Sequence, residues 1–234
     1  MAAEGERRRR LLQLASGAAF LVIVGVAALI VASGTGTGAG GDTHLEGRAA
    51  VDSLLAGIPQ EGMALGDRGA PVALIEFGDL QCPFCRHYAE AVLPPIIENQ
   101  VKNGRAKIEF RNSTIIGEQS TPAGAAALAA GAQGRGWSYV ELFYRNQGEE
   151  NSGYADDAFL RAIAKGAGVP NLARWERERR MLVPEVEQTT AEAQQLGFTG
   201  TPSFALEGPR SREPEPIGTP EDTGALEEAI EAAR

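Results

Sequence analysis

The only two cysteines of the chain, Cys82 and Cys85, are spaced C-x-x-C, and the segments around them constrain the fold more than any other feature. An apolar run at 72–77 precedes them and is typical of a buried parallel strand, and residues 83–93 have the pattern of a helix. A cysteine at such a junction lies near the helix N-terminus, where unpaired N–H groups and the helix dipole favour a thiolate over a thiol. The pattern therefore predicts a dithiol at the end of a central strand.

Redox chemistry is the interpretation that this spacing favours. Pro83 fits the first helical turn, and Cys85 lies one turn further in, close enough to form a disulfide with Cys82. A structural disulfide is a weaker alternative, because a bridge across two residues closes a very short loop and constrains the unfolded chain little. A zinc site would need further ligands, and the chain offers only His44 and His87, neither placed as a second ligand pair.

Charge and composition bound the class of protein. The chain has 234 residues, 43% of them hydrophobic, which suffices for one medium domain with a proper core. Its formal net charge is −9, and no basic patch occurs beyond the N-terminus. A protein that binds nucleic acid needs a basic face, so we expect no nucleic-acid partner.

The N-terminal segment predicts a membrane anchor. Four arginines at 7–10 precede an apolar stretch at 11–32, which as a helix would rise roughly 33 Å and match the hydrocarbon core of a bilayer. The arginines predict a cytoplasmic basic tail at 1–10 and an extracytoplasmic remainder. A cleaved signal peptide is the alternative, because small residues at 31–34 resemble a cleavage site. In both cases the domain lies where disulfides are tolerated.

The rest of the chain alternates between strands and helices after a Gly-rich linker that begins at 33 and leads, with one short helix, to residue 59. Helices are expected at 44–58, from 83 to about 103, and at 123–132, 137–144, 156–164, 171–180, 184–196 and 219–233. Strands are expected at 63–65 (as a brief edge strand), 72–77, 106–111, 202–206 and near 216–217. Two consecutive prolines at 94–95 predict a break or kink in the second helix.

Several single residues carry local predictions. Thr121 is expected to cap the helix that follows it, and Thr219 to open the last helix through a capping box. Glu76 stands inside the apolar run at 72–77, where a carboxylate is either solvent-facing or a buried acid. The charge run at 174–180 is interpreted as a solvated helix face. The aromatic residues of the second inserted helix are expected in the core: Trp137, Tyr139, Phe143 and Tyr144.

The order of elements, with helices inserted between a βαβ half and a ββα half, resembles the thioredoxin fold in its DsbA-like form. The residues that carry the resemblance are the segment at 76–86, which contains Cys82 and Cys85, and the segment at 198–204, which contains Thr201 and Pro202. A Gly-Thr-Pro tripeptide alone is a weak signal, but it is specific when a C-x-x-C follows a strand upstream. The resemblance implies an α/β thioredoxin domain at 60–234 with a helical insertion at about 118–196.

Membership of that family would assign a role to each matching residue. Cys82 would be the attacking sulfur and Cys85 the resolving thiol. Pro202 would follow a cis peptide bond and present the Thr201 backbone to an extended substrate. Glu76 would be a buried acid with a raised pKa that relays a proton to or from Cys85. Substrate contacts would also come from the two residues between the cysteines, Pro83 and Phe84.

One departure from the family leaves the direction of electron flow open. Strongly oxidising members carry His where this chain has Phe84, which cannot donate a hydrogen bond or charge from its side chain to the Cys82 thiolate. The thiolate is then less stabilised and the oxidising power lower. Arg86 and His87 could compensate in part, although their positions favour solvent. Phe84 could instead contact unfolded clients.

The sequence favours a membrane-anchored, extracytoplasmic enzyme that donates disulfides to secreted proteins and is reoxidised by a membrane oxidase. We expect a monomer with no cofactor and no bound metal. A reductase or isomerase of disulfides is the alternative within the class. A thioredoxin-fold adaptor, or a copper carrier that uses Cys82, Cys85 and His87, is the alternative outside it.

Overall fold

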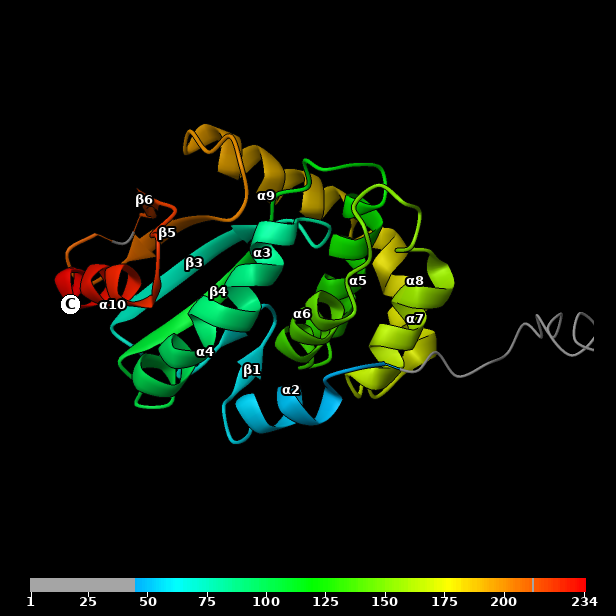
Figure 1. Ribbon diagram of the computed structural model, residues 1–234, viewed down its shortest axis with the longest axis horizontal. Coiled ribbons are helices and arrows are strands. Elements are labelled where there is room, and N and C mark those ends of the chain that lie inside the picture. Colours follow the sequence, from blue (N-terminus) through cyan, green and yellow to red (C-terminus); the bar gives the residue numbers. More distant parts are fainter. Residues whose placement is uncertain (1–44, 212) are drawn as a thin grey trace, which may run out of the picture. The chain divides into compact units, whose positions relative to one another are not determined.

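The computed structural model describes residues 45–211 and 213–234, and in this part of the chain a six-stranded mixed sheet is flanked by helices (Figure 1). The strand order is β1-β2-β4-β3-β5-β6. The bounds of the strands are β1 Gln60–Glu61, β2 Ala64–Leu65, β3 Val72–Gly78, β4 Ala106–Asn112, β5 Ser203–Glu207 and β6 Glu215–Gly218. The predicted short strand at 63–65 is therefore not the edge, because β1, which the sequence did not predict, pairs outside it.

The two central strands are parallel, and a helical crossover joins them. All seven residues of β3 are buried, because helices cover both faces of the sheet at this strand. In β4 buried and half-buried residues alternate. Glu76 pairs with Phe110 on one side and with Phe204 of the antiparallel β5 on the other. The predicted βαβ and ββα halves of a thioredoxin fold are both present.

The two faces of the sheet are covered by different helices. Leu74 and Phe110 belong to the larger core, together with residues of the crossover helix, of α6 (Gly136–Arg145) and of α10 (Thr223–Ala233). On the opposite face Ile75 and Phe77 pack with α9 (Val183–Gln195). Because side chains alternate along a strand, Glu76 lies on the face of Leu74 and Phe110.

The crossover helix is continuous but not uniformly α-helical. It consists of α3 Pro83–His87, the π turn η1 Tyr88–Val92, α4 Leu93–Ile96 and a second π turn η2 Ile97–Val101. Of the break or kink predicted at the two prolines, the break does not occur, because they occupy the first turn of α4 directly after η1. A π turn shifts the hydrogen-bond register, and there the missing proline N–H groups cost little.

A group of five helices lies between β4 and β5, as the sequence predicts. They are α5 Ser120–Gly131, α6, α7 Asp157–Gly166, α8 Leu172–Met181 and α9. Asp156 and Asn171 cap α7 and α8 by accepting hydrogen bonds from the backbone N–H groups of Phe159 and Arg174. The four aromatic side chains predicted for the core are each at most 1% exposed: Trp137, Tyr139, Phe143 and Tyr144.

Two predicted caps are wrong. Helix α5 begins at Ser120, so Thr121 lies inside the helix, where its hydroxyl donates to Thr114. Helix α10 is capped by Asp222, whose carboxylate accepts from Ala225 N–H. The hydroxyl of Thr219 donates instead to the carbonyl of Pro202. In both cases a threonine resembling a cap bonds to the loops around the sheet end rather than to its helix.

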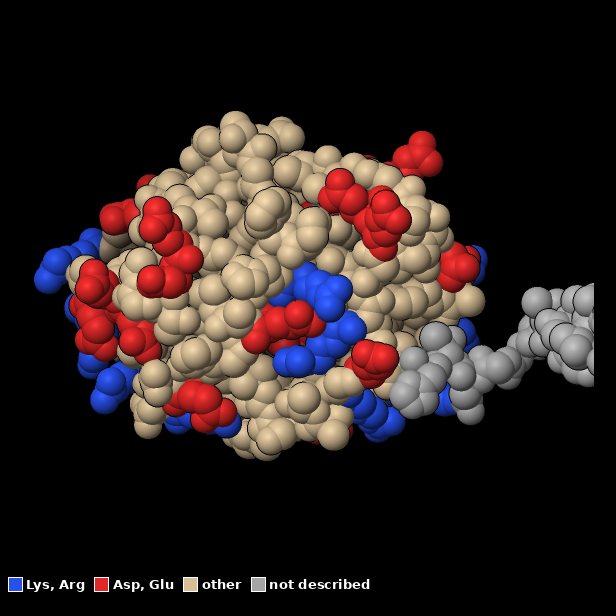
Figure 2. Space-filling model, viewed as in Figure 1, with Lys and Arg blue, Asp and Glu red and all other residues tan. Residues whose placement is uncertain are grey.

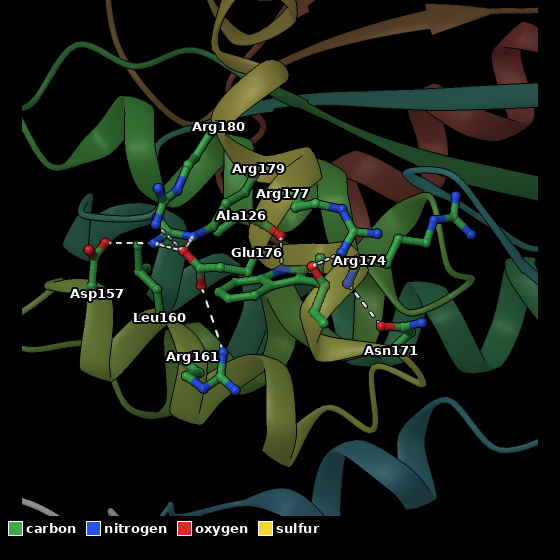
Figure 3. Close-up of polar contacts among 12 residues, drawn as sticks. Ala126, Asp157, Leu160, Arg161, Asn171, Arg174, Glu176, Arg177, Arg179 and Arg180 are labelled. Atoms are coloured by element: carbon green, nitrogen blue, oxygen red, sulfur yellow. Dashed lines mark hydrogen bonds and ion pairs between the residues drawn. The ribbon is translucent and has the colours of Figure 1, made fainter.

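The charge run on α8 is only in part a solvated face (Figure 3). Arg180 is exposed, but Arg179 is 7% exposed and lies over the Trp175 ring, 5.3 Å from its centroid. Arg179 also pairs with Glu176 at 2.7 Å and with Asp157 of α7 at 2.8 Å. The run therefore joins two helices of the insertion.

The N-terminal predictions concern mostly residues that lie outside the described part of the chain. These are the basic tail at 1–10, the anchor at 11–32 and the linker up to 44. The helix expected at 44–58 is present as α2, Arg48–Leu54, and is shorter. Among the described residues, no helix combines the length and apolar character that crossing a bilayer requires.

Candidate dithiol active site

The C-x-x-C segment lies where strand β3 leads into helix α3. Cys82 has an extended backbone and is the N-cap of α3, and Pro83 occupies the first helical turn, as predicted. The amide of Cys82 donates to the carbonyl of Asp79 at 2.9 Å, and its own carbonyl accepts from Arg86 N–H at 3.1 Å. Both cysteines are free thiols and largely buried, Cys82 being 2% exposed and Cys85 0%.

The environment of Cys82 favours its ionised form. Its pKa is lowered to about 6, chiefly because the Cys85 thiol donates a hydrogen bond to it; burial opposes this effect. The Thr201 side chain and the backbone N–H groups of Cys85 and Phe84 lower it further. Phe84 thus stabilises the thiolate through its main chain, so the absence of His at this position does not leave the thiolate without donors.

Cys85 has the opposite character. Burial raises its pKa well above the ordinary value, and its hydrogen bond to Cys82 and the nearby negative charges of Cys82 and Glu76 raise it further. One sulfur of the pair is therefore ionised near neutral pH while the other keeps its proton. Thiol–disulfide exchange requires this difference, since one sulfur attacks as a thiolate and the other gains or loses a proton.

Glu76 is buried, at 1% exposure, and its Oε1 has no hydrogen-bond partner. Its pKa is raised to about 8, first by burial and then by the negative charges of Glu141 and Cys82. Of the two alternatives that the sequence left open, the buried acid is correct. At neutral pH it is a protonated carboxyl group in the same buried layer as Cys85.

The loop before β5 faces the first cysteine. The Thr201–Pro202 peptide bond is cis, as the resemblance implied. The sulfur of Cys82 lies 3.3 Å from the carbonyl oxygen of Thr201. Two bonds fix the loop: the hydroxyl of Ser203 donates to Gly200 O at 2.8 Å, and that of Thr219 donates to Pro202 O at 2.6 Å. The fold thus brings together residues far apart in the sequence.

An open groove runs beside the dithiol. It has a volume of about 380 Å³ and is lined by Phe84, Tyr88, residues 197–203 and Thr219. The Phe84 side chain is 70% exposed at its edge, an unusual state for a large apolar group. The groove therefore offers an apolar surface next to Cys82 that an extended polypeptide could contact.

Two residues that help to hold the site, Asp79 and Gln147, were not predicted from the sequence. The carboxylate of Asp79 is buried and accepts from the N–H groups of Gln81, Ile115 and Ile116 at 2.8 to 3.0 Å. The amide of Gln147 donates to the carbonyls of Leu80 and Cys82. The sequence carries no signal for these contacts, because each depends on how the inserted helices pack against the loop.

Arg86 and His87 lie toward solvent, as their positions favoured. Arg86 pairs with Glu90 at 3.3 Å, and the exposed His87 ring lies edge-on to Tyr88. The described residues contain no cluster of three or more His, Cys, Asp or Glu side chains that could hold a metal ion. Neither observation supports a copper site made of the two cysteines and His87.

Comparisons with known proteins agree with this geometry. A family model described as thioredoxin matches residues 59–231. A probable disulfide bond formation protein D of Bacillus cereus is 27% identical over 150 residues, which cover 62% of this chain and 69% of the relative. Oxidised BdbD from Bacillus subtilis has a similar structure, with a TM-score of 0.66 at 20% identity over 75% of this chain and 97% of BdbD. A thioredoxin-like oxidoreductase from Silicibacter pomeroyi gives 0.58 at 28% identity, over 78% and 96%.

The fold and the dithiol define the class: this is a thiol–disulfide oxidoreductase of the DsbA-like kind. The chain belongs to the thioredoxin family, whose model spans the sheet, the dithiol helix and the inserted helices.

Proposed function

We propose that the chain is an extracytoplasmic disulfide donor, tethered to the membrane by residues 11–32, that acts through Cys82 and Cys85. The observation that carries the proposal is the unequal acidity of the two thiols, with the pKa of Cys82 lowered to about 6 and that of Cys85 raised. A stable Cys82 thiolate stabilises the reduced enzyme and makes Cys82 a good leaving group. Both effects favour passing a disulfide on to a client.

The cycle begins with the Cys82–Cys85 disulfide. A client thiolate attacks the sulfur of Cys82, the disulfide bond breaks, and Cys85 leaves as a thiolate that takes a proton from the Glu76 carboxyl. A second client thiolate then attacks the client sulfur of the mixed disulfide and releases the Cys82 thiolate. The client has lost two electrons and gained a disulfide, and the enzyme holds the two electrons as a dithiol.

Client binding would use the groove beside Phe84 and the backbone around Thr201 and Pro202. The groove is apolar and open, and it fits a segment of unfolded polypeptide better than a small polar ligand. Reduced secreted proteins are the proposed clients, and a membrane-bound oxidase that accepts the two electrons is the proposed second partner. We propose that the chain acts as a monomer.

The reduction potential tests the direction. The full chain, purified in detergent, is equilibrated with glutathione buffers, quenched with acid and alkylated to count free thiols at Cys82 and Cys85. The pKa of Cys82 lies between those of thioredoxin, about 7, and of DsbA, about 3.5. We therefore expect a potential between their values of about −270 and −120 mV, and less negative than roughly −210 mV. A value near about −270 mV would indicate a reductase, and cysteines that never exchange would exclude the enzymatic function.

A further inference from the structure

A second buried acid, Glu141, lies in the middle of helix α6. Its side chain is 1% exposed, and neither carboxylate oxygen has a hydrogen-bond partner. A fully buried carboxyl group without hydrogen bonds is costly to fold around. The cycle proposed above does not use this group, so its burial needs an explanation.

Glu141 faces the same buried layer as Glu76. On α6, residues 137, 141 and 144 follow a spacing of three to four and so share one face. The outer two contact the sheet region: the Trp137 indole donates to Met63 O, and the Tyr144 hydroxyl donates to Asp79 O. Tyr144 also meets Phe110 edge to face, and Phe110 is the β4 partner of Glu76. Glu141 therefore points from α6 toward the side of the sheet that carries Glu76.

On its other side Glu141 leads to the surface. Arg145, one turn further along α6, lies 3.5 Å from its carboxylate and is 20% exposed. Glu90 of η1, whose negative charge also acts on Glu141, pairs with Arg86. Arg145 and Arg86 are half-buried and Glu90 is exposed. Figure 2 shows acidic and basic side chains together near the centre of the face that it draws. Glu141 thus stands between the buried dithiol layer and a charged, hydrated surface.

We propose that Glu141 is the second carboxyl group of a proton path that connects Cys85, through Glu76, with the solvent near Arg145. When the disulfide opens, the Cys85 thiolate takes the proton of Glu76, and the resulting Glu76 carboxylate takes the proton of Glu141. The Glu141 carboxylate, held by the Arg145 guanidinium, is reprotonated from water. One proton enters from solvent and one S–H bond forms at Cys85; reoxidation runs the path in reverse. The inference rests on the proposed exchange cycle.

The acidities of the two carboxyls fit this role. The pKa of Glu141 is raised to about 7, by burial first, with Arg145 lowering it and Glu90 raising it. That of Glu76 is about 8. Neighbouring acids with similar pKa values near neutrality exchange a proton at little cost. The elements packed against α6 carry these other charged or titratable side chains: Arg48, Asp52, Glu61, Tyr88, Asp157, Arg161, Lys165 and the exposed His87.

The test is the pH profile of a single turnover in Glu141→Gln. The oxidised full chain in detergent is mixed with a reduced two-cysteine peptide between pH 5 and 9, and the Cys85 thiol formed is counted after acid quench and alkylation. We expect the rate at pH 7 to fall about tenfold, because one acid–base step is lost. The part of the rate–pH curve that follows the titration of Glu76 (the limb set by Glu76) should move to lower pH, because Glu141 no longer raises the pKa of Glu76.

Two controls separate this role from a structural one. Glu178→Gln makes the same change in another i,i+4 pair with arginine, on α8, and should leave the profile unchanged. Alkylation of the reduced Cys82 by iodoacetamide should keep its pH dependence in Glu141→Gln, since Glu141 is not among the groups that set the pKa of Cys82. An unchanged turnover profile in Glu141→Gln would overturn the inference, whereas absence of exchange in the unaltered chain would overturn the proposed function.

Arg145→Gln provides a second variant should Glu141→Gln fold poorly. Because Arg145 lowers the pKa of Glu141, its removal should raise that pKa and shift the limb set by Glu141 to higher pH. In Glu141→Gln, by contrast, the limb set by Glu141 disappears and the limb set by Glu76 moves to lower pH. A limb that stays in place would contradict the path.

Discussion

Two regions of this molecule place a glutamate against the core in opposite electrostatic settings: Glu176 is half-buried among arginines, and Glu76 is fully buried without a cation. Between α7 and α8, the carboxylate of Glu176 accepts from Arg179 and Arg180 and lies 3.9 Å from Arg161 (Figure 3). Its pKa is lowered, chiefly by the hydrogen bond from Arg179. Under the dithiol, Glu76 has no cationic partner among the groups that act on it, and its pKa is raised to about 8.

The difference separates charges that hold the fold together from charges that react. An acid surrounded by donors stays ionised over the whole neutral range and serves as a fixed anchor between helices. An acid buried without donors keeps a proton that it can give away near pH 7. Placing such an acid inside the domain costs stability, and proteins accept that cost mainly at functional sites.

The largest expected effect concerns Glu76→Gln, which removes the buried acid. The pKa of Glu76 is raised in the folded state, so wild-type stability falls as pH rises from about 4.5 to about 8. The variant lacks this loss and should gain on the order of a few kcal/mol at pH 8.5 relative to wild type, and almost none at pH 4.5. Urea denaturation of both reduced proteins across this range measures the gain. The exposed Glu187→Gln on α9 is the control, and a gain independent of pH would contradict the buried-acid assignment.

The residues of the dithiol site differ in how well the sequence alone predicts them. The strand, the C-x-x-C and the proline at 202 are local patterns, and they sufficed for the fold and for the positions of Cys82 and Cys85. The burial of Glu76 was left as an alternative, because an acid in an apolar run does not reveal which face it takes. Glu141 gave no signal at all, since a glutamate in an aromatic helix has the pattern of an ordinary surface position. Its role depends on packing between α6 and the sheet.

The next effect sharpens the other half of the comparison. Arg179→Met keeps an aliphatic side chain over the Trp175 ring but removes the bonds to Glu176 and Asp157. We expect a loss of about 1 kcal/mol in the free energy of unfolding, because the hydrogen bonds of the buried Arg179 guanidinium are lost while its partners Glu176 and Asp157 stay partly or largely exposed to water. Arg180→Met removes a side chain that is 70% exposed and should cost less than about 0.5 kcal/mol. Both variants should exchange disulfides at the wild-type rate. A slower rate would mean that the charges between α7 and α8 also affect the reaction at the dithiol, against the distinction drawn above.

The smallest effect tests whether hydroxyl donors tune the dithiol. The Oγ1 atom of Thr201 is buried without another hydrogen-bond partner, and the Thr201 side chain is among the groups that lower the pKa of Cys82. Thr201→Val keeps the shape of the side chain and removes this donor, so the pKa of Cys82 should rise by up to about one unit, a factor of about ten in thiolate population. The ultraviolet absorbance of the thiolate, followed against pH in the reduced protein, measures the shift. Thr199→Val alters an exposed threonine of the same groove and should leave the pKa unchanged. Equal shifts in both variants would mean that the groove as a whole, rather than the Thr201 hydroxyl, sets the acidity of Cys82. In that case the buried Thr201 hydroxyl, unlike the buried Glu76 carboxyl, would have no specific effect on the dithiol.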